Sequence, residues 1–237
     1  MKAVDVANLL KKRIPEDVGC WAGETYGFNG VDPDREVKMV LWAVTASQEV
    51  VDYAKKNGFD MLVSHHPHMM DNFPHCVFHT ALDCCDGGMN DMWRDIYGVA
   101  NPRHFDGTLG WHGQISPCTI ETLKMKAEEF IGYNVDGEVW SVDPGRLLRS
   151  VVICSGLGGM VNDTALTTGA DCYILGESCR KARETGFKAV LEIGHTKSER
   201  CGINLINDIL NPHGMLVVEV PLELDRFGNE YYSRRKP

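Results

Sequence analysis

Residues 38–66 read KMVLWAVTASQEVVDYAKKNGFDMLVSHH, and this stretch decides the fold of the 237-residue chain. The apolar runs at its two ends, Lys38–Thr45 and Asp60–His65, predict buried strands. The polar stretch between them predicts a helix that Ser47 caps and Gly58 ends. A strand, a helix and a second strand in this order form a βαβ unit, so we expect parallel strand pairing here.

The alternation of strands and helices continues along the rest of the chain. The further strands that we expect are Cys76–Ala81, Leu147–Cys154, Asp171–Leu175, Ala189–Ile193 and Met215–Val220. The further helices that we expect are residues 3–13, Gly88–Tyr97, Thr119–Ile131, Met160–Thr168, Cys179–Thr185 and Glu199–Leu210. This order predicts an α/β protein with a largely parallel or mixed sheet covered by helices, and a soft internal boundary near residues 98–113.

The overall charge argues against two classes of partner. The chain has 24 Lys and Arg against 33 Asp and Glu, a formal net charge of -9. Nucleic acids and anionic membranes bind basic surfaces, so we expect neither as a general partner. No run of about 20 apolar residues is present, and the first residues lack the apolar core of a signal peptide. We therefore expect a cytoplasmic protein whose nine cysteines are reduced and mostly small core residues.

Two adjacent histidines follow the second strand of the βαβ unit, in the sequence Ser64-His65-His66-Pro67. Ligand sites in open α/β sheets form outside the carboxyl ends of strands, which is where this pair stands. Adjacent side chains on an extended chain point to opposite sides, so the pair suits two neighbouring ions better than one shared ion. The alternative is a pair of loop histidines without a ligand.

A second set of polar residues follows the next expected strand, in the sequence His79-Thr80-Ala81-Leu82-Asp83. The carboxylate of Asp83 could bridge two cations, although an Asp here can also cap a helix or end a turn. His79 could hold a ligand carboxylate or a water molecule, or it could be a core histidine.

A third set follows the expected strand Ala189–Ile193, in the sequence Gly194-His195-Thr196-Lys197-Ser198-Glu199. On a helix, His195 and Glu199 lie four residues apart on one face, close enough to share a metal site. The competing interpretation is a capping box in which Thr196 caps the helix and Glu199 bonds back to it. Glu177 follows another expected strand and could orient a ligand or act as a base.

Together these strand ends supply histidines and carboxylates without cysteine. That donor set suits zinc, iron, manganese or cobalt and does not select one of them. Five ligands exceed the needs of one tetrahedral structural zinc. The sequence therefore predicts two divalent metal ions per chain, about 3.5–4 Å apart, which lower the pKa of bound water. The predicted ligands are His65, His66, Asp83, His195 and Glu199.

Two other features could bind an anion, and each has a simpler interpretation. Ser155–Gly159 is glycine-rich and follows a strand, so its backbone N–H groups could meet a phosphate, although a tight turn between strand and helix is the better interpretation. Arg180 and Lys181 could also meet a phosphate, but exposed charges on a helix are commoner.

These motifs also recur in a specific order along the whole chain. In that order they are Asp17-Val18-Gly19 with Gly23, Ser64-His65-His66-Pro67, His79-Thr80-Ala81-Leu82-Asp83, Gly87-Gly88-Met89-Asn90-Asp91, Val151–Gly156, Gly169-Ala170-Asp171-Cys172-Tyr173-Ile174-Leu175-Gly176-Glu177, and Gly194-His195-Thr196-Lys197-Ser198-Glu199. In this the chain resembles the Nif-three-like dinuclear metal-centre proteins, which are also named GTP cyclohydrolase 1 type 2 homologues.

The resemblance implies an α/β fold of two similar halves with mixed sheets flanked by helices, so that residues 1–237 form a single unit of two interleaved halves. It implies a homo-oligomer, in the form of a toroidal hexamer whose metal sites face an internal cavity. It also maps His65, His66, Asp83, His195 and Glu199 onto the metal-ligand positions of the family.

Three features depart from the family pattern. Only twelve residues separate His66 from His79, where the family usually has a longer segment that carries a helix. Ala81 replaces the usual Asn, and Ser178-Cys179-Arg180-Lys181 stands where a stretch with histidine often follows. The expected ligands are kept, but a substrate is not carried over with them.

Three functions fit this reading. The first is a hydrolase in which metal-activated hydroxide attacks a phosphoester or a nucleotide, with Glu177 and His79 as candidate catalytic residues. The second is a non-enzymatic metal-binding ring that binds or sequesters a small molecule or nucleotide, or acts as a regulator or scaffold; the short segment after His66 favours it. The third is a structural role for the metals.

Overall fold

The computed structural model describes residues 1–19, 21–66, 72–105, 107–135, 137–184 and 186–225. Contacts within the chain divide it into two compact units. Unit 1 consists of Met1–Gly88 and Gly202–Pro237, and unit 2 is the continuous segment Met89–Cys201. The soft boundary near residues 98–113 and the organisation as one unit of interleaved halves stay predictions.

Unit 1 contains a five-stranded sheet in the order β1-β4-β3-β2-β11. Its strands are β1 (Tyr26–Phe28), β2 (Met39–Thr45), β3 (Met61–His66), β4 (His75–Phe78) and β11 (Leu216–Glu219). The four strands other than β1 pair in parallel, and β1 lies antiparallel to β4 at the edge. The parallel pair β2 and β3 confirms the βαβ unit expected from residues 38–66.

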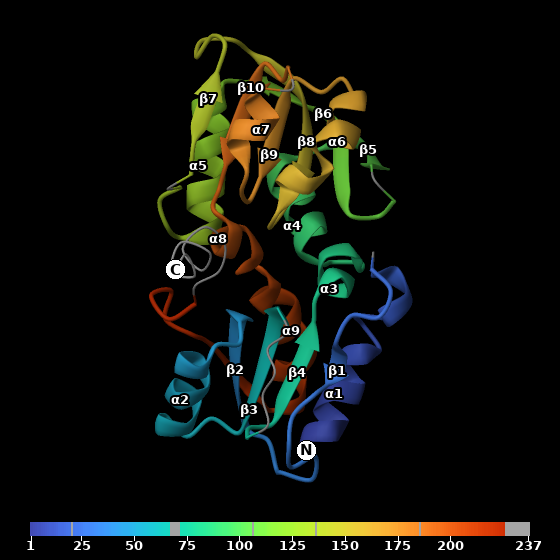
Figure 1. Ribbon diagram of the computed structural model, residues 1–237, viewed down its shortest axis with the longest axis vertical. Helices are drawn as coiled ribbons and strands as arrows, with labels where there is room; N and C mark the ends of the chain where they lie inside the picture. Colours follow the sequence, from blue (N-terminus) through green and yellow to red (C-terminus); the bar gives the residue numbers. More distant parts are fainter. Residues whose placement is uncertain (20, 67–71, 106, 136, 185, 226–237) are drawn as a thin grey trace, which may run out of the picture. The chain divides into compact units, whose positions relative to one another are not determined.

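The helices of unit 1 lie on both faces of this sheet (Figure 1). They are α1 (Ala3–Lys11), α2 (Gln48–Lys56), α3 (Thr80–Cys84) and α9 (Gly202–Leu210), with short 3-10 turns at Glu16–Val18 and Asn211–His213. Ser47 caps α2 as expected, because its hydroxyl accepts a hydrogen bond from the Val50 N–H. Leu41 and Leu62 pack under α2, whereas Trp42 faces Gly202 of α9. Strand alternation thus gives β2 two apolar faces.

Unit 2 contains a six-stranded mixed sheet in the order β5-β6-β8-β9-β10-β7. Its strands are β5 (Ala100–Phe105), β6 (Gly110–Cys118), β7 (Val139–Ser141), β8 (Leu148–Cys154), β9 (Cys172–Leu175) and β10 (Ala189–Glu192). The central strands β8, β9 and β10 run parallel, and the outer pairings are antiparallel. This sheet has the mixed pairing that we expect for an α/β fold.

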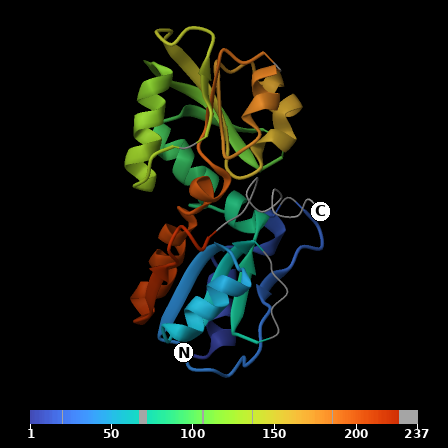
Figure 2. The same cartoon turned by 60° about the vertical axis from the view of Figure 1, so that its left-hand side comes forward.

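The helices of unit 2 also cover both faces of their sheet, as Figure 2 shows. They are α4 (Met89–Tyr97), α5 (Ile120–Ile131), α6 (Asn162–Thr167), α7 (Cys179–Glu184) and α8 (His195–Glu199), with a 3-10 turn at Gly158–Val161. Val152, Tyr173 and Val190 from the central strands pack against Ala165 of α6 and Ala182 of α7. The two helix-covered sheets confirm the expected fold class.

Two expected elements differ clearly from the structure. The strand expected at Cys76–Ala81 ends at Phe78, and Thr80 begins helix α3. The helix expected at Glu199–Leu210 is two helices, because α8 ends at Glu199 and α9 begins at Gly202. Residues 98–113 contain β5 and the first part of β6. Pro67, which follows the two adjacent histidines, lies outside the described residues.

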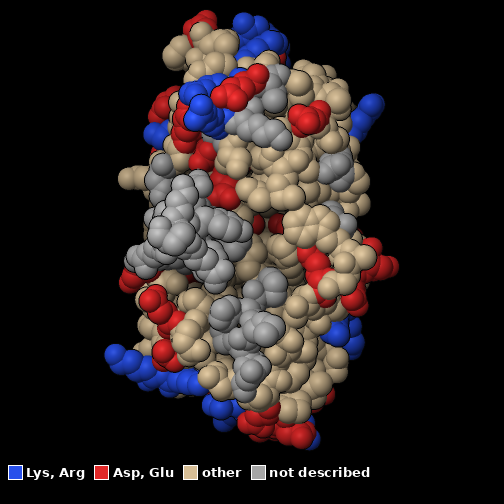
Figure 3. Space-filling view, viewed as in Figure 1, with Lys and Arg blue, Asp and Glu red and all other residues tan. Residues whose placement is uncertain are grey.

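Two observations bear on the expected partners. Among the described residues, none of the helices is both long and apolar enough to cross a membrane. On the face shown in Figure 3, the described Lys and Arg side chains lie among Asp and Glu side chains and form no broad basic surface.

Candidate metal centre

In unit 1, three histidines from two neighbouring strand ends form one cluster. His65 and His66 end β3, and His79 stands directly before α3. The ring centroids are 4.7 Å apart for His65 and His66, 4.9 Å for His65 and His79, and 5.3 Å for His66 and His79. One ring nitrogen from each lies within 4.8 Å of the others, so the three histidines could hold a metal ion. Asp83 joins them, with Oδ2 3.7 Å from Nε2 of His65.

The expectation that His65 and His66 point to opposite sides of their strand is wrong for this cluster. Their ring centroids lie 4.7 Å apart with the ring planes at 52° to each other, and a nitrogen of each lies within 4.8 Å of a nitrogen of the other. His66 is the last residue of β3 and pairs only with Thr45 of β2, whose hydroxyl lies 3.0 Å from Nδ1 of His66. The end of the strand and this side-chain contact direct the ring, rather than the regular alternation of a longer strand.

Each histidine of the cluster has its Nδ1 atom held by an oxygen of unit 1. Nδ1 of His65 lies 3.2 Å from the carbonyl oxygen of Phe78. Nδ1 of His79 lies 2.6 Å from Oε1 of Glu24. Carbonyl and carboxylate oxygens only accept hydrogen bonds, so Nδ1 carries the proton in both rings. Nε2 is then the candidate ligand atom, which is the usual way that proteins orient histidine for a metal.

Glu24 holds the start of α3 as well as His79. Its Oε2 atom accepts hydrogen bonds from the Thr80 hydroxyl at 2.6 Å and from the Thr80 N–H at 3.3 Å. The helix has no side-chain cap on its own N-terminal residue. A carboxylate at this position accepts a hydrogen bond from a backbone N–H of the first turn and favours the helix. Glu24 thereby fixes the helix that carries Asp83.

In unit 2, His195 lies between two carboxylates. Its Nδ1 atom lies 3.3 Å from Oε1 of Glu177, which follows β9. Its Nε2 atom lies 3.2 Å from Oε2 of Glu199, four residues later on α8. All three side chains are at least 90% buried. This arrangement repeats that of unit 1: one nitrogen faces an orienting oxygen, and the other faces a possible ligand.

The protonation of His195 follows from these neighbours. Burial by itself lowers the pKa of an imidazole, but the charge of Glu199 and the contacts with both carboxylates raise the pKa of His195 to about 10. Without a metal ion, the protonated ring supplies the positive charge between Glu177 and Glu199. A cation at Nε2 would take the place of that proton.

The geometry of α8 decides between the two interpretations of its sequence. Gly194, not Thr196, is the N-cap residue, so this helix has no side-chain cap. Thr196 lies inside the helix, so the capping box is wrong. His195 and Glu199 face each other, as the metal-site interpretation requires.

The glycine-rich segment Ser155–Gly159 is a tight turn that supports Glu199. Gly156 has φ +60, and the Gly156 and Gly159 N–H groups bond to the Ser198 hydroxyl and the Glu177 carbonyl. A Cβ atom on Gly156 would lie 2.0 Å from Oε1 of Glu199. The segment therefore turns its N–H groups toward the protein, which confirms a turn rather than an anion site. Arg180 is exposed and pairs with Glu184 on the same helix.

Comparison with known proteins identifies the family. The family model described as Duf34/NIF3 (NGG1p interacting factor 3) matches residues 1–77 and 69–222. The chain belongs to the Duf34/NIF3 family. A protein of Methanocaldococcus jannaschii named GTP cyclohydrolase 1 type 2 homolog is 30% identical over 237 residues, covering 89% of this chain and 95% of the relative. A protein with the same name from Pasteurella multocida is 25% identical over 256 residues, covering 92% and 97%.

Solved structures of Duf34/NIF3 proteins share the fold. Reduced HcgD from Methanocaldococcus jannaschii has a TM-score of 0.76 at 22% identity, covering 92% of this chain and 97% of that chain. A Bacillus cereus protein related to NIF3 has a TM-score of 0.77 at 15% identity, covering 96% and 99%. At these identities the likeness shows the fold alone.

Within this Duf34/NIF3 chain, the predicted ligands fall into two groups. Unit 1 brings together His65, His66 and Asp83, and unit 2 brings together His195 and Glu199. The sequence analysis missed Glu24, which holds His79 and α3. Its only sequence signal is its place beside Gly23 in a segment that carries the family resemblance, because its contacts lie 56 residues away.

Proposed function

We propose that this Duf34/NIF3 protein is a metal-dependent hydrolase that acts on a nucleotide or a phosphoester. We propose further that two divalent ions bind at a dinuclear centre held by residues of both units. The proposed ligands are His65, His66, Asp83, His195 and Glu199. The observation that carries the proposal is the cluster of His65, His66 and His79, whose ligand atoms lie within 4.8 Å of one another.

The donor atoms fit divalent metal ions. Imidazole nitrogen and carboxylate oxygen suit zinc, iron, manganese and cobalt. His65 and His79 already have Nδ1 directed at a protein oxygen, as metal-bound histidines do. His195 has the same arrangement toward Glu177.

The course of the chain supports a shared site. Gly202 of α9 packs against Leu82, the neighbour of Asp83 on α3. Glu199 lies only three residues before Gly202 along the chain. Three residues span at most about 11 Å, so the covalent chain allows Glu199 to reach the same ions as Asp83.

The chain's own residues have distinct roles in this proposal. Divalent ions bound here would supply Lewis acidity, which stabilises developing negative charge and favours the ionisation of water near neutral pH. Glu177 orients His195, and Glu24 orients His79. Glu177 and His79 are the candidates for moving a proton, because each is a titratable group beside a proposed ligand.

The substrate class rests on the relatives. Two of them are named GTP cyclohydrolase 1 type 2 homolog, which favours a nucleotide. We propose a homo-oligomer, with the hexamer of the family resemblance as its form, and a cytoplasmic location. The same site could serve a protein that binds a nucleotide without changing it.

Metal content tests the first part of this proposal. Protein purified without chelator is expected to hold two divalent ions per chain by elemental analysis. The double variant His65→Ala/His66→Ala is expected to lose them, whereas His213→Ala, an exposed histidine in unit 1, keeps them. A wild-type metal content below about 0.2 per chain after incubation with zinc, iron, manganese and cobalt would overturn the metal site.

Turnover tests the second part. Wild-type protein loaded with each metal is incubated with a panel of nucleotides and phosphoesters, beside the double variant. We expect hydrolysis that the double variant lacks. A bound nucleotide recovered unchanged after denaturation, with no turnover of the panel, would refute the hydrolase and favour the binding protein.

A further inference from the structure

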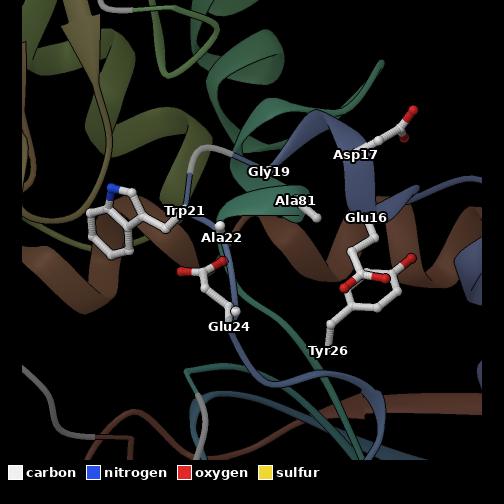
Figure 4. Close-up of a pocket in the computed structure, with 9 residues that line it drawn as sticks. Glu16, Asp17, Gly19, Trp21, Ala22, Glu24, Tyr26 and Ala81 are labelled. Carbon is white, nitrogen blue, oxygen red and sulfur yellow. The ribbon is translucent and has the colours of Figure 1, made fainter.

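A second feature of unit 1 lies beside the histidine cluster: a pocket of about 330 Å³. Its lining comes from the segment before and within β1 and from the start of α3, as Figure 4 shows. The lining residues are Glu16, Asp17, Gly19, Trp21, Ala22, Gly23, Glu24, Tyr26 and Ala81. A volume of this size accommodates a single aromatic ring with a polar substituent.

The lining combines carboxylates with aromatic surface. Glu16 and Glu24 supply two carboxylates, the carboxylate of Asp17 points away from them (Figure 4), and no Lys or Arg is among the lining residues that the structure describes. Glu24 stands between Trp21 on one side and Glu16 with Tyr26 on the other (Figure 4). The Trp21 side chain is 48% exposed, so part of its indole ring is open to a ligand.

These lining groups favour a cationic ligand over an anionic one. Carboxylates in a concave, partly apolar site repel phosphates and attract cations, and an indole ring adds attraction for a cation through its π face. Amidinium and guanidinium groups are planar, carry paired N–H donors and match carboxylate geometry. At Gly23, where a Cβ atom would meet nothing within 4 Å, the backbone leaves room for such a flat group.

The pocket shares a wall with the candidate metal centre. Glu24 lines the pocket, and its Oε1 atom lies 2.6 Å from Nδ1 of His79. The Trp21 ring packs edge-on against the His79 ring, with centroids 5.3 Å apart. A ligand in the pocket would therefore lie one side chain away from the histidine cluster.

We propose that this pocket is a recognition site for a planar cationic group, of the amidinium or guanidinium class, on a small molecule that the protein binds. The location beside the histidine cluster rests on the proposed function: the anionic or reacting end of the ligand lies at the metal ions and the cationic end lies between Trp21, Glu24 and Glu16. Binding of the cationic group itself needs no metal, because every group that recognises it belongs to the chain.

Three small probes that share a phenyl ring test the charge preference of the pocket. They are benzamidine, which is cationic, benzamide, which is its neutral analogue, and phenyl phosphate, which is anionic. Titrated into the full-length, metal-free protein and followed by calorimetry or NMR, benzamidine is expected to bind at least about tenfold more tightly than benzamide. Phenyl phosphate is expected not to displace it.

Variants then place the bound probe. Glu16→Gln and Trp21→Ala are each expected to weaken benzamidine binding at least about fivefold. Glu49→Gln, which removes an exposed carboxylate from α2 outside the pocket, is expected to leave it unchanged. Equal affinity for benzamidine and benzamide would overturn the proposal, as would equal weakening by Glu49→Gln and Glu16→Gln.

The metal content of the same samples separates this inference from the proposed function. Selective benzamidine binding by a protein that takes up no metal would keep the pocket and refute the metal centre. Two bound metals without selective benzamidine binding would keep the metal centre and refute the pocket.

Discussion

At the scale of single residues, the histidines of the candidate centre share one arrangement. His65 has Nδ1 at a backbone carbonyl, His66 at a hydroxyl, and His79 and His195 at carboxylates. Each contact fixes the rotation of a ring, and the contacts to carbonyl and carboxylate oxygens also place the proton on Nδ1. Rings fixed in this way lose little conformational freedom when a metal binds, which is why proteins surround metal-binding histidines with such oxygens.

This arrangement allows a substitution that separates metal binding from folding. In His65→Asn, the amide nitrogen takes about the place of Nδ1 and keeps the contact with the Phe78 carbonyl, but nothing replaces Nε2. We expect the free energy of unfolding of this variant to lie within about 1.5 kcal/mol of the wild-type value, because the buried contact persists. We expect it to lose at least one metal ion per chain by elemental analysis. Full metal content with normal stability would show that Nε2 of His65 is not a ligand.

Glu24 gives a second prediction at this scale. Glu24→Ala removes the contacts with both His79 and Thr80, whereas Glu24→Gln keeps an acceptor oxygen for one of them. Glu24 also fixes the start of α3, the helix that carries the proposed ligand Asp83. Removing a residue that orients such a ligand typically weakens metal affinity about 10–100-fold. Competition of a chelator for bound Co²⁺ is expected to place Glu24→Ala in that range and Glu24→Gln between it and the wild type. Glu49→Gln, with the same change on α2, serves as the control and is expected to match the wild type.

At the scale of elements, the sequence predicts those parts of the fold whose causes are local. The strands β2 and β3 are apolar runs, and α2 has its own cap in Ser47, so all three are predicted within one or two residues. Helix α3 is not predicted, because the group that starts it is Glu24, 56 residues away. A β-rich run continues through Thr80 in sequence, and the carboxylate that accepts from the Thr80 N–H at the start of the helix lies far from it along the chain.

The helix α8 was ambiguous for a different reason. The same Thr196 and Glu199 fit a capping box and a helix with a metal site, since both patterns use a spacing of three or four residues. The structure separates them because Gly194 is the N-cap, so that the helix begins two residues earlier than a capping box at Thr196 would start it, and the tight turn at Gly156 bonds to Ser198 of this helix. Turns of this kind depend on contacts between β8, β9 and α8, which no short segment of sequence contains.

The turn at Gly156 gives a prediction with a matched control. Gly156 and Gly169 have φ of +60 and +66, so Ala at either position carries similar backbone strain. Only at Gly156 does a Cβ atom lie 2.0 Å from Oε1 of Glu199; nothing lies within 4 Å at Gly169. We expect Gly169→Ala to cost about 1 kcal/mol in the free energy of unfolding and to keep its metals.

Gly156→Ala is expected to cost at least about 1 kcal/mol more than that and to lose metal, because Glu199 must move. Urea unfolding and elemental analysis measure the two effects. Indistinguishable behaviour of the two variants would contradict the role of Gly156 in placing Glu199.

A prediction about pH concerns Asp171, the residue directly before β9. Asp171 accepts a hydrogen bond from the Arg149 N–H at 2.8 Å and pairs with Lys188. Burial raises the pKa of Asp171, but Lys188 and the Arg149 N–H together hold that pKa below its usual value of 3.8. A carboxylate with a lowered pKa stabilises the fold above about pH 4 and loses that contribution as the pH falls through its folded pKa.

Asp171→Asn is therefore expected to be less stable than the wild type by about 1–2 kcal/mol at pH 7 and at pH 5. The difference should shrink as the pH falls below 4, where the wild type protonates. Urea unfolding at pH 7, 5 and 3 measures it. A difference that stays constant down to pH 3 would contradict the assignment to the ionised carboxylate.

At the scale of the whole molecule, unit 2 is an insertion into unit 1. All six strands of its sheet and helices α4–α8 lie within Met89–Cys201. Unit 1 is completed by two segments from opposite ends of the chain, since β11 pairs with β2 and α9 packs on Trp42. The family resemblance implies two interleaved α/β halves, but the order of elements alone does not show where one half interrupts the other, because β2 pairs both with the nearby β3 and with β11 near the other end of the chain.

This topology predicts that a fragment of unit 2 folds by itself, whereas the first segment of unit 1 does not. A fragment of residues 89–201 contains every strand of its sheet and the apolar core under α6 and α7, so we expect it to fold and to unfold cooperatively. A fragment of residues 1–88 lacks β11 and α9, which leaves the edge of β2 and the ring of Trp42 exposed, and we expect it to aggregate or stay unfolded. Circular dichroism and thermal unfolding distinguish the two outcomes.

The fragment of residues 89–201 also tests whether the proposed centre needs ligands from both units. Residues 89–201 keep His195, Glu177 and Glu199 in their native contacts but lack His65, His66 and Asp83. With one imidazole and two carboxylates, the fragment is expected to bind Zn²⁺ or Co²⁺ at least about tenfold more weakly than the full-length chain. A folded fragment that binds metal as tightly as the full chain would confine the site to unit 2, and the ligands of unit 1 would then have another role.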